Sequence, residues 1–153
     1  MTSARVLVVD DTDHVRATIV SMLALDGFEV VAQTGDPLQA VGLAVRHDPH
    51  VVVMDLRMPG VDGLEATRRV RAVRPDQQVL LFTAYLDDDL AGQAREAGAA
   101  LVVSKIDGIA VLAREVSRLT LALSRSDRPT IEVLGGRVET PDETGTAVKG
   151  WTA

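Results

Sequence analysis

The chain has 153 residues, enough for one domain with a proper core, and 46% of them are apolar but only 3% aromatic. Its formal net charge of −6 at pH 7 gives no indication of a surface that binds nucleic acid or anionic lipid. The absence of cysteine excludes disulfides, thiolate catalysis and thiolate metal sites. We find no signal peptide and no apolar run of membrane-spanning length, so we expect a soluble, cytoplasmic protein without membrane contact.

Five short apolar runs recur along the chain, at intervals of roughly 25 residues, and turn residues bound each of them. Most of these runs lack polar alternation, which is typical of strands buried on both faces of a parallel sheet. The second run contains Glu29 and is therefore expected nearer an edge of the sheet. The predicted strands are residues 6–9, 28–32, 51–54, 79–82 and 101–103.

Helical patterns alternate with these strands. The first helix is expected to end near Gly27, and the second to open at Asp36 as its cap with Pro37 in the first turn. The third begins at Gly63, and Asp87–Asp89 lead the fourth, which Gly98 closes. The residues expected to face the core are Val15, Ile19, Met22, Leu23, Leu38, Val41, Val45, Leu64, Thr67, Val70, Leu112, Val116, Leu119 and Leu123.

Alternation of strand and helix predicts an α/β fold, a doubly wound five-stranded parallel sheet of the flavodoxin-like type with strand order 2-1-3-4-5. Ligands bind such sheets at the carboxyl ends of the strands, where the strand order reverses. In this order the reversal lies between the first and third strands. The residues that leave those two strands are Asp10, Asp11 and Asp55, so the sequence places a functional site there.

Three carboxylates at neighbouring strand ends repel one another, at a cost of about 4 kcal/mol per pair at 4 Å. Such a cluster ionises fully only with a cation, and oxygen ligands with an open position suit Mg²⁺. One carboxylate could then act as a nucleophile toward phosphorus. Lys105, the only lysine before residue 125, and the hydroxyl of Thr83 stand at two further strand ends and fit a phosphoryl site.

These motifs together resemble the receiver domains of two-component response regulators, over about residues 4–124. The resemblance implies the CheY-like form of the fold and a phosphoacceptor that promotes only its own phosphorylation and dephosphorylation, not an enzyme. The motifs that carry it are Asp10-Asp11 after the first strand, Asp55-Leu56-Arg57-Met58-Pro59-Gly60 with Gly63, Thr83-Ala84, and Lys105.

By this resemblance Asp55 is the phosphoacceptor and Mg²⁺ is the cofactor. The side chains of Asp11 and Asp55 and the backbone carbonyl of Arg57 are then implied to bind the metal, with Asp10 holding it mainly through water. Thr83 and Lys105 are implied to contact the phosphoryl group.

The resemblance also implies the partners of this site. The phosphoryl donor is a histidine kinase or a phosphotransfer protein, and the readout is a protein-binding face built from the fourth helix, fifth strand and fifth helix. We expect an unknown downstream protein and no direct nucleic-acid contact, and we leave homodimerisation open.

The strand–helix pattern fails after about Ser124. We therefore expect residues 1–124 to form a receiver domain and residues 125–153 to form a flexible tail with at most one short strand or hairpin near 131–134. The tail is too short for a DNA-binding domain and carries four basic and five acidic residues. This organisation predicts a single-domain response regulator without an output domain.

Two positions depart from the receiver pattern. Many receivers have an aromatic residue in the last strand, which here holds Leu101, Val102 and Val103, and the lysine is usually followed by proline, where this chain has Ile106. Tyr85 could take over part of the missing aromatic's role. Arg57 and Tyr85 are also bulky enough to flank the path of a hydrolytic water, which predicts a long-lived phosphoryl group.

Other readings account for less of the pattern. A phosphatase of the dehalogenase type needs a second aspartate two residues after the nucleophile, where this chain has Arg57. A nucleotide-binding protein needs a glycine-rich loop after the first strand, and the acidic Asp10–Asp13 is its electrostatic opposite. The remaining alternatives are a phosphorylation-independent interaction module and the receiver part of a longer DNA-binding regulator.

Overall fold

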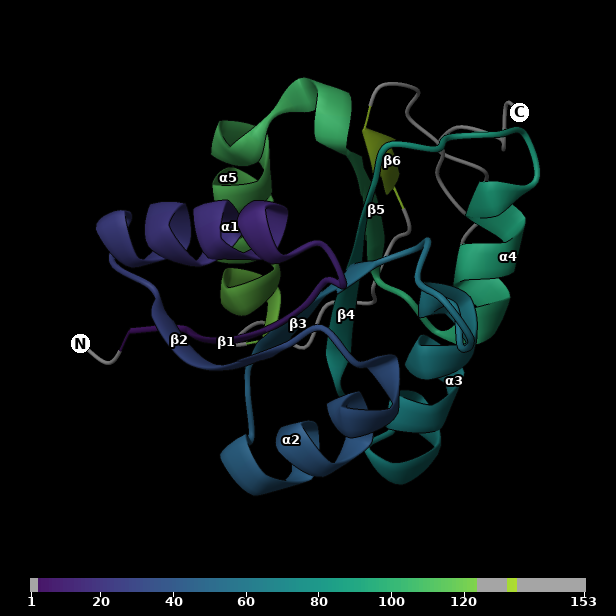
Figure 1. Cartoon of the computed structure of the whole chain (residues 1–153), viewed down its shortest axis with the longest axis horizontal. Helices are drawn as coiled ribbons and strands as arrows, with labels where there is room; N and C mark the ends of the chain where they lie inside the picture. The colour runs from purple at the N-terminus through teal and green to yellow at the C-terminus, as the bar shows by residue number, and fades with distance from the viewer. Residues whose placement is uncertain (1–2, 124–131, 135–153) are drawn as a thin grey trace.

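The computed structural model describes residues 3–123 and 132–134, which form a parallel sheet covered by helices on both faces (Figure 1). The strands are β1 (Arg5–Val9), β2 (Glu29–Thr34), β3 (Val51–Asp55), β4 (Gln78–Thr83), β5 (Leu101–Ser104) and β6 (Glu132–Leu134). The α-helices are α1 (Asp13–Leu25), α2 (Ala40–His47), α3 (Gly63–Val73), α4 (Leu90–Ala97) and α5 (Ile109–Leu123), with 3₁₀ turns η1 (Pro37–Gln39) and η2 (Lys105–Asp107).

The sheet has the order β2-β1-β3-β4-β5-β6 and every pair is parallel. The predicted fold class and the order 2-1-3-4-5 are therefore confirmed. The short strand expected near 131–134 is confirmed as β6, which pairs with β5 so that Leu134 lies opposite Val103. The expected flexibility of residues 125–153 falls, apart from β6, outside the described residues.

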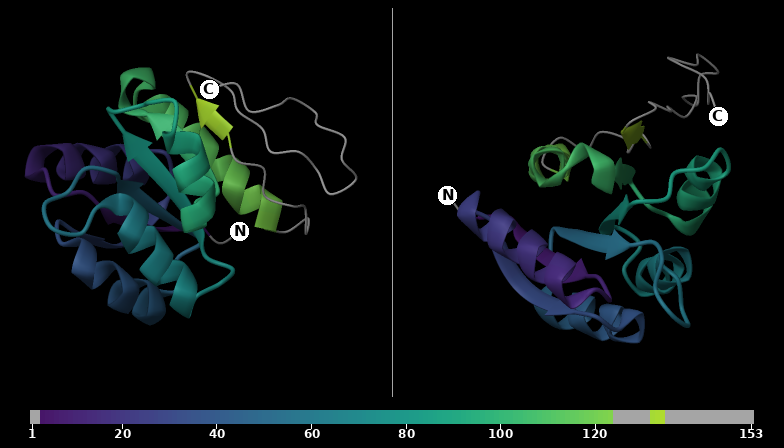
Figure 2. Two further views of the ribbon diagram at one scale, coloured as in Figure 1. Left: turned by 90° about the vertical axis from the view of Figure 1, so that its right-hand side faces the viewer. Right: turned by 45° about the horizontal axis from the view of Figure 1, so that its top comes forward.

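Two apolar cores lie on opposite faces of the sheet, because side chains alternate along each strand. One core joins the sheet to α2, α3 and α4, and the other joins it to α1 and α5. Figure 1 shows this division, with α1 and α5 on one side of the sheet and α2 and α3 on the other, and Figure 2 shows the fold from two further directions. All five residues of β3 are buried, as the uninterrupted apolar run predicts.

The predicted core faces are confirmed for α3, where Leu64, Thr67 and Val70 are buried. They are wrong for Met22 of α1, which is 39% exposed, because Ile19 and Leu23 are the buried residues of this helix and Val15 and Val20 pack beside them. They are also wrong for Leu38 and Val45 at the second helix.

The second helix opens as the 3₁₀ turn η1 rather than as an α-helix. Asp36 caps it, with its side chain accepting a hydrogen bond from the Leu38 backbone N–H, as expected. Leu38 lies within this turn, whose three residues per turn do not follow the 3.6-residue period of the prediction, and its side chain is exposed. The small Ala40 and Ala44 face the sheet instead.

Within the described residues no helix combines the length and apolar character that crossing a membrane requires.

Candidate functional site

The carboxyl ends of the central strands bring most of the predicted site residues together. Asp10 follows β1 and Asp55 ends β3, so they lie on neighbouring strands. Thr83 ends β4, and Lys105 follows β5. Arg57 follows β3; the prediction concerned its backbone carbonyl, and its side chain is exposed.

Carboxylate oxygens of Asp10, Asp11 and Asp55 lie within 4.8 Å of one another. Asp10 and Asp55 are buried, with 1% and 6% of their surfaces exposed, and Asp11 is half-buried. Burial raises the pKa of Asp55 above its ordinary value, and the neighbouring charge of Asp10 raises it further, against the opposing effect of Lys105. The cluster therefore holds more negative charge than its own protein surroundings neutralise.

Lys105 reaches into this cluster from the end of β5. Its ammonium nitrogen lies 3.1 Å from Asp10 Oδ2 and 3.3 Å from Asp55 Oδ1. The side chain is 22% exposed, whereas those of Asp10 and Asp55 are 2% and 8% exposed. One ammonium thus bridges two strand ends and, when all three carboxylates are ionised, leaves two negative charges of the cluster uncompensated.

A loop between β3 and α3 shapes the other wall of the site. The backbone N–H of Gly63 donates to the carbonyl of Leu56 at 2.8 Å and folds the loop back onto the end of β3. A Cβ at Gly63 would lie 2.1 Å from the carbonyl oxygen of Asp55, so only glycine fits. Asp62 caps α3 by accepting a hydrogen bond from the Glu65 backbone N–H. These contacts fix Asp55 at the start of the loop.

Thr83 is fully buried at the end of β4. Its Oγ1 accepts a hydrogen bond of 3.0 Å from the backbone N–H of Tyr85, which leaves the hydroxyl proton free to be donated elsewhere. The guanidinium carbon of Arg57 lies 4.4 Å from the centroid of the Tyr85 ring. This contact joins the start of the loop after β3 to the start of the loop after β4.

The donor set suits a hard divalent cation. Three carboxylates offer oxygen ligands only, and an oxygen-only set at a partly open position is typical of Mg²⁺ rather than of zinc or copper. The raised pKa of Asp55 shows that its ionised form gains from an added positive charge. The residues present thus fit the magnesium site that the sequence predicts.

Sequence reasoning gave no role to Arg16, which the structure places directly behind the acidic cluster. Its Nη1 donates a hydrogen bond of 2.6 Å to the backbone carbonyl of Asp10. Asp13 and Arg16 stand three residues apart on α1, and this spacing in the sequence indicates an ion pair along a helix, which the structure contains. The bond to a strand end is a long-range contact that no local pattern reveals.

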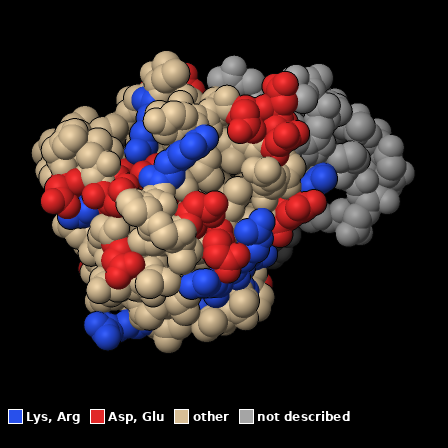
Figure 3. All heavy atoms as spheres, turned by 45° about the vertical axis from the view of Figure 1, so that its right-hand side comes forward, with Lys and Arg blue, Asp and Glu red and all other residues tan. Residues whose placement is uncertain are grey.

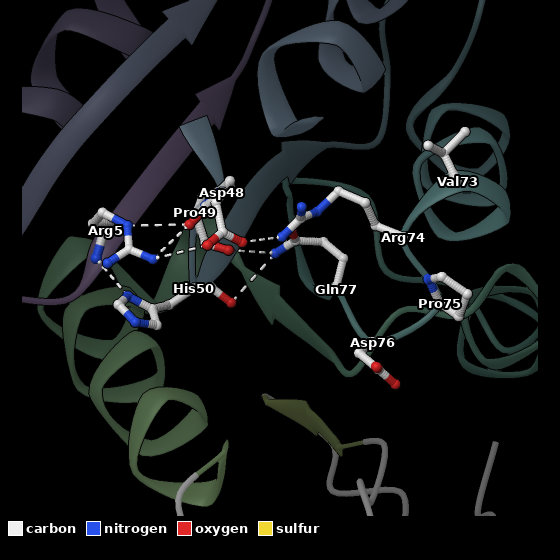
Figure 4. Close-up of a pocket in the computed structure, with 9 residues that line it drawn as sticks. All are labelled: Arg5, Asp48, Pro49, His50, Val73, Arg74, Pro75, Asp76 and Gln77. Atoms are coloured by element: carbon white, nitrogen blue, oxygen red, sulfur yellow. Dashed lines mark hydrogen bonds and ion pairs between the residues drawn. The ribbon is translucent and has the colours of Figure 1, made fainter. Parts of the chain in front are cut away.

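A second hollow, of about 520 Å³, lies at the opposite, amino-terminal end of the strands (Figure 4). There Asp48 lies between Arg5 and Arg74, bonded to both guanidinium groups, and the Arg74 hydrogen bond lowers the pKa of Asp48. The Arg5 backbone N–H donates to His50 Nδ1 at 2.9 Å. None of the predicted site residues lines this hollow, and three of its charged side chains, Arg5, Asp48 and Arg74, already pair with one another.

The surface over α3 and α4 carries interleaved acidic and basic side chains (Figure 3). On α3 the guanidinium groups of Arg68 and Arg69 both pair with Glu65, at 3.5 and 3.0 Å. These basic side chains therefore do not form a continuous positive surface on this helix.

Comparison with known proteins places the whole α/β unit in one family. Residues 6–116 match the sequence model of the response regulator receiver domain. The response regulator GacA of Pseudomonas viridiflava is 41% identical over 128 residues, which are 83% of this chain and 59% of that protein. The transcriptional regulatory protein PdtaR of Mycobacterium tuberculosis is 37% identical over 139 residues, 91% of this chain and 65% of that protein.

Among solved structures, a two-component response regulator of the LuxR family from Aurantimonas sp. SI85-9A1 aligns with a TM-score of 0.75 at 34% identity. The alignment covers 79% of this chain and 87% of that one. This chain spans less than two thirds of the length of the curated relatives named above.

Proposed function

This chain belongs to the response regulator receiver family, and we propose that Asp55 is the residue that accepts the phosphoryl group. The observation that carries the proposal is the cluster of Asp10, Asp11 and Asp55, with oxygens within 4.8 Å and an ammonium from Lys105 bridging two of them. Each of these groups stands at a strand end, where this fold places its ligands.

In the proposed reaction an oxygen of the Asp55 carboxylate attacks phosphorus, a phosphorus–oxygen bond forms, and the donor leaves with the electrons of its broken bond to phosphorus. Asp10, Asp11, Asp55 and the backbone carbonyl of Arg57 would hold Mg²⁺. A bound magnesium ion supplies charge neutralisation for the phosphoryl oxygens.

Lys105 and Thr83 have separate roles in this proposal. The ammonium of Lys105 exchanges its contact with Asp55 for a phosphoryl oxygen. The hydroxyl of Thr83 donates to another phosphoryl oxygen, because it already accepts from the Tyr85 backbone and keeps its proton available. The added charge of about −1.5 to −2 then biases the β4–α4 loop between two arrangements, which a partner protein reads.

We propose protein partners for this unit: a histidine kinase or phosphotransfer protein as donor and an unidentified protein as target. The exchange would take place in the cytoplasm, as a step of a phosphorelay. The paired arginines of α3 and the net charge of −6 support the absence of direct nucleic-acid contact by this unit.

For the domain organisation we propose a single receiver, residues 1–124, with residues 125–153 as a tail rather than an output domain. One observation favours a different second candidate. The matched relatives are longer than this chain, and one of them is named a transcriptional regulatory protein. In that second reading the chain is the receiver part of a longer DNA-binding regulator.

Intact-protein mass after incubation with acetyl phosphate and Mg²⁺ tests the proposal. We expect one added phosphoryl group, absent in Asp55→Asn and absent when the metal is chelated. No adduct, together with no Mg²⁺ binding by calorimetry, would overturn it in favour of a phosphorylation-independent interaction module.

A further inference from the structure

The guanidinium of Arg16 connects three elements at the back of the acidic cluster. Beside the 2.6 Å bond from Nη1 to the Asp10 carbonyl, Nη2 donates to Asp13 Oδ1 at 2.8 Å and Nε donates to Gln33 Oε1 at 3.2 Å. The side chain is only 17% exposed. Arg16 thus ties the end of β1 to α1, on which it stands, and to β2.

Space for this guanidinium is provided by Gly35, just beyond β2. A Cβ at Gly35 would lie 2.9 Å from Arg16 Nη1 and 3.6 Å from both the Asp10 carbonyl oxygen and the Asp11 Cα. A larger residue at position 35 would displace the guanidinium of Arg16 but would meet the backbone only at ordinary contact distance. Arg16 and Gly35 are therefore fitted to each other.

The bond from Arg16 matters most for Asp11. Asp10 has its own restraints, since its Oδ1 accepts from the Thr12 backbone N–H at 2.9 Å and its Oδ2 contacts Lys105. Among the contacts of residues 3–123 and 132–134, we find no hydrogen-bond donor to the Asp11 carboxylate. The position of that carboxylate thus depends on its backbone, and the peptide group that enters Asp11 begins at the carbonyl that Arg16 holds.

We infer that Arg16 is a positioning residue, which holds the Asp10–Asp11 peptide so that the Asp11 carboxylate can join Asp10 and Asp55 around a divalent cation. This inference rests on the proposed function, because it assigns Arg16 to the cation site of the phosphoryl transfer. Supporting contacts of this kind are often worth about tenfold or more in metal affinity.

A purely electrostatic role for Arg16 predicts the opposite effect. Removing a positive charge near a cation site should tighten Mg²⁺ binding if its field dominated. The guanidinium already pairs with Asp13 at 2.8 Å, so the pair is close to neutral as seen from the site. We therefore expect the loss of positioning at Asp11 to affect Mg²⁺ binding more than the loss of the Arg16 charge.

Two substitutions at Arg16 separate these effects. Arg16→Lys keeps the charge but cannot reach three acceptors, and Arg16→Gln removes the charge. We expect both to raise the Kd for Mg²⁺ alone, measured by calorimetry on the full unphosphorylated chain, by about tenfold. Matched substitutions at Arg69, whose ion pair with Glu65 lies on exposed α3, should leave the Kd unchanged.

Gly35→Ala provides a test that keeps every ligand and Arg16 itself. The new methyl group meets the far end of a flexible side chain, so the protein should fold while the guanidinium is displaced, and the Kd for Mg²⁺ should rise about threefold or more. Gly92→Ala, with open space around it, is its control. For all variants, excess Mg²⁺ should restore the rate of phosphorylation by acetyl phosphate, which lost folding would not allow.

The outcomes distinguish this inference from the proposed function. Wild-type affinity in Arg16→Lys, or tighter binding in Arg16→Gln, would overturn the positioning role and leave the phosphorylation site intact. A wild-type chain that binds no Mg²⁺ and accepts no phosphoryl group would overturn both. Weaker binding in Arg16→Lys, Arg16→Gln and Gly35→Ala, with unchanged controls, supports the role of Arg16.

Discussion

Arg57 lies over the ring of Tyr85, with the guanidinium carbon 4.4 Å from the ring centroid. The contact joins the loop after β3 to the loop after β4. Tyr85 is 56% exposed, so this contact lies at the surface rather than in the core.

We propose that the Arg57–Tyr85 pair slows the hydrolysis of a phosphoryl group on Asp55, because both side chains are bulky and follow strands that end at the site. For the double variant Arg57→Ala/Tyr85→Ala we expect dephosphorylation to be about three- to tenfold faster, the equivalent of about 1 kcal/mol, because water reaches the site more freely. The measurement is loss of phosphorylated mass after the donor is removed. A rate equal to wild type would refute a shielding role for the pair.

Asp55→Asn should stabilise the protein at pH 7 in the absence of Mg²⁺. The folded protein raises the pKa of Asp55 above its ordinary value, so ionisation of this group costs stability as pH rises through that ordinary value and the raised folded one. We expect a Tm about 2–5 °C higher in Asp55→Asn, measured by calorimetry.

This gain should disappear at pH 3, where Asp55 is protonated in wild type, and should shrink when Mg²⁺ is added. Asp76→Asn, at an exposed position, is the control for the removal of one negative charge. A Tm that falls in Asp55→Asn at pH 7 would mean that the contact with Lys105 outweighs burial and repulsion.

His50 should make the stability depend on pH. Its Nδ1 accepts from the Arg5 backbone, and burial and the charge of Arg5 lower its pKa below the ordinary value of 6.5, although Asp48 opposes them. The stability that neutral His50 contributes to the folded protein is complete above pH 6.5. It is lost as pH falls toward the lowered pKa of His50 in the folded protein.

His50→Asn keeps an acceptor for the Arg5 N–H but cannot titrate. Between pH 7.5 and 5.5 the wild type should lose roughly 2–4 °C more in Tm than this variant does. Identical losses in the two proteins, measured by thermal melts in parallel, would rule out His50 as the titrating group.

Gly63→Ala should disrupt the site and the fold together. The added Cβ would lie 2.1 Å from the Asp55 carbonyl oxygen and 2.9 Å from the Leu56 Cα, both backbone atoms that cannot yield without moving the loop. We expect a loss of about 3 kcal/mol or more in the free energy of unfolding, measured with urea. Gly42→Ala, inside α2 with nothing near its Cβ, should instead stabilise by about 0.5–1 kcal/mol.

Thr83→Ala should leave phosphorylation in place but weaken the binding of the phosphorylated protein to its partner. The hydroxyl of Thr83 ties the phosphoryl group to the β4–α4 loop in the proposed mechanism, so its loss uncouples the two by about tenfold in affinity. Thr83→Ser keeps the hydroxyl and should behave as wild type. The readout is partner affinity of each phosphorylated variant, and equal values for wild type and Thr83→Ala would contradict this coupling.

The strands and the site could be predicted from the sequence because the signals are local and strong. The apolar run Val51–Met54 followed by Asp55 needs no distant information to be a buried strand that ends in an acid. In a parallel sheet the carboxyl ends meet at one edge, so strand order alone brings Asp10, Asp11 and Asp55 together.

The helix faces were harder to predict because helical periodicity fails where a helix begins as a 3₁₀ turn. Leu38 and Val45 are larger and more apolar than Ala40 and Ala44, so a pattern based on hydrophobicity selects the wrong face of α2.

The hydrogen bonds of Arg16 could not be predicted from the sequence for another reason. They depend on how α1 lies against β1 and β2, which tertiary packing decides.

The strand β6 has a consequence for how the chain behaves when it is shortened. Without β6, β5 would present to other molecules the N–H and C=O groups of a strand whose first three residues, Leu101–Val103, are apolar. Exposed edges of that kind recruit strands from neighbouring chains and start aggregation. With β6 in place, the outermost strands of the described sheet are β6 and β2, and β2 begins with the exposed Glu29, a charge that discourages such pairing. Fragments meant for solution work should therefore extend through Leu134 rather than stop at the end of α5.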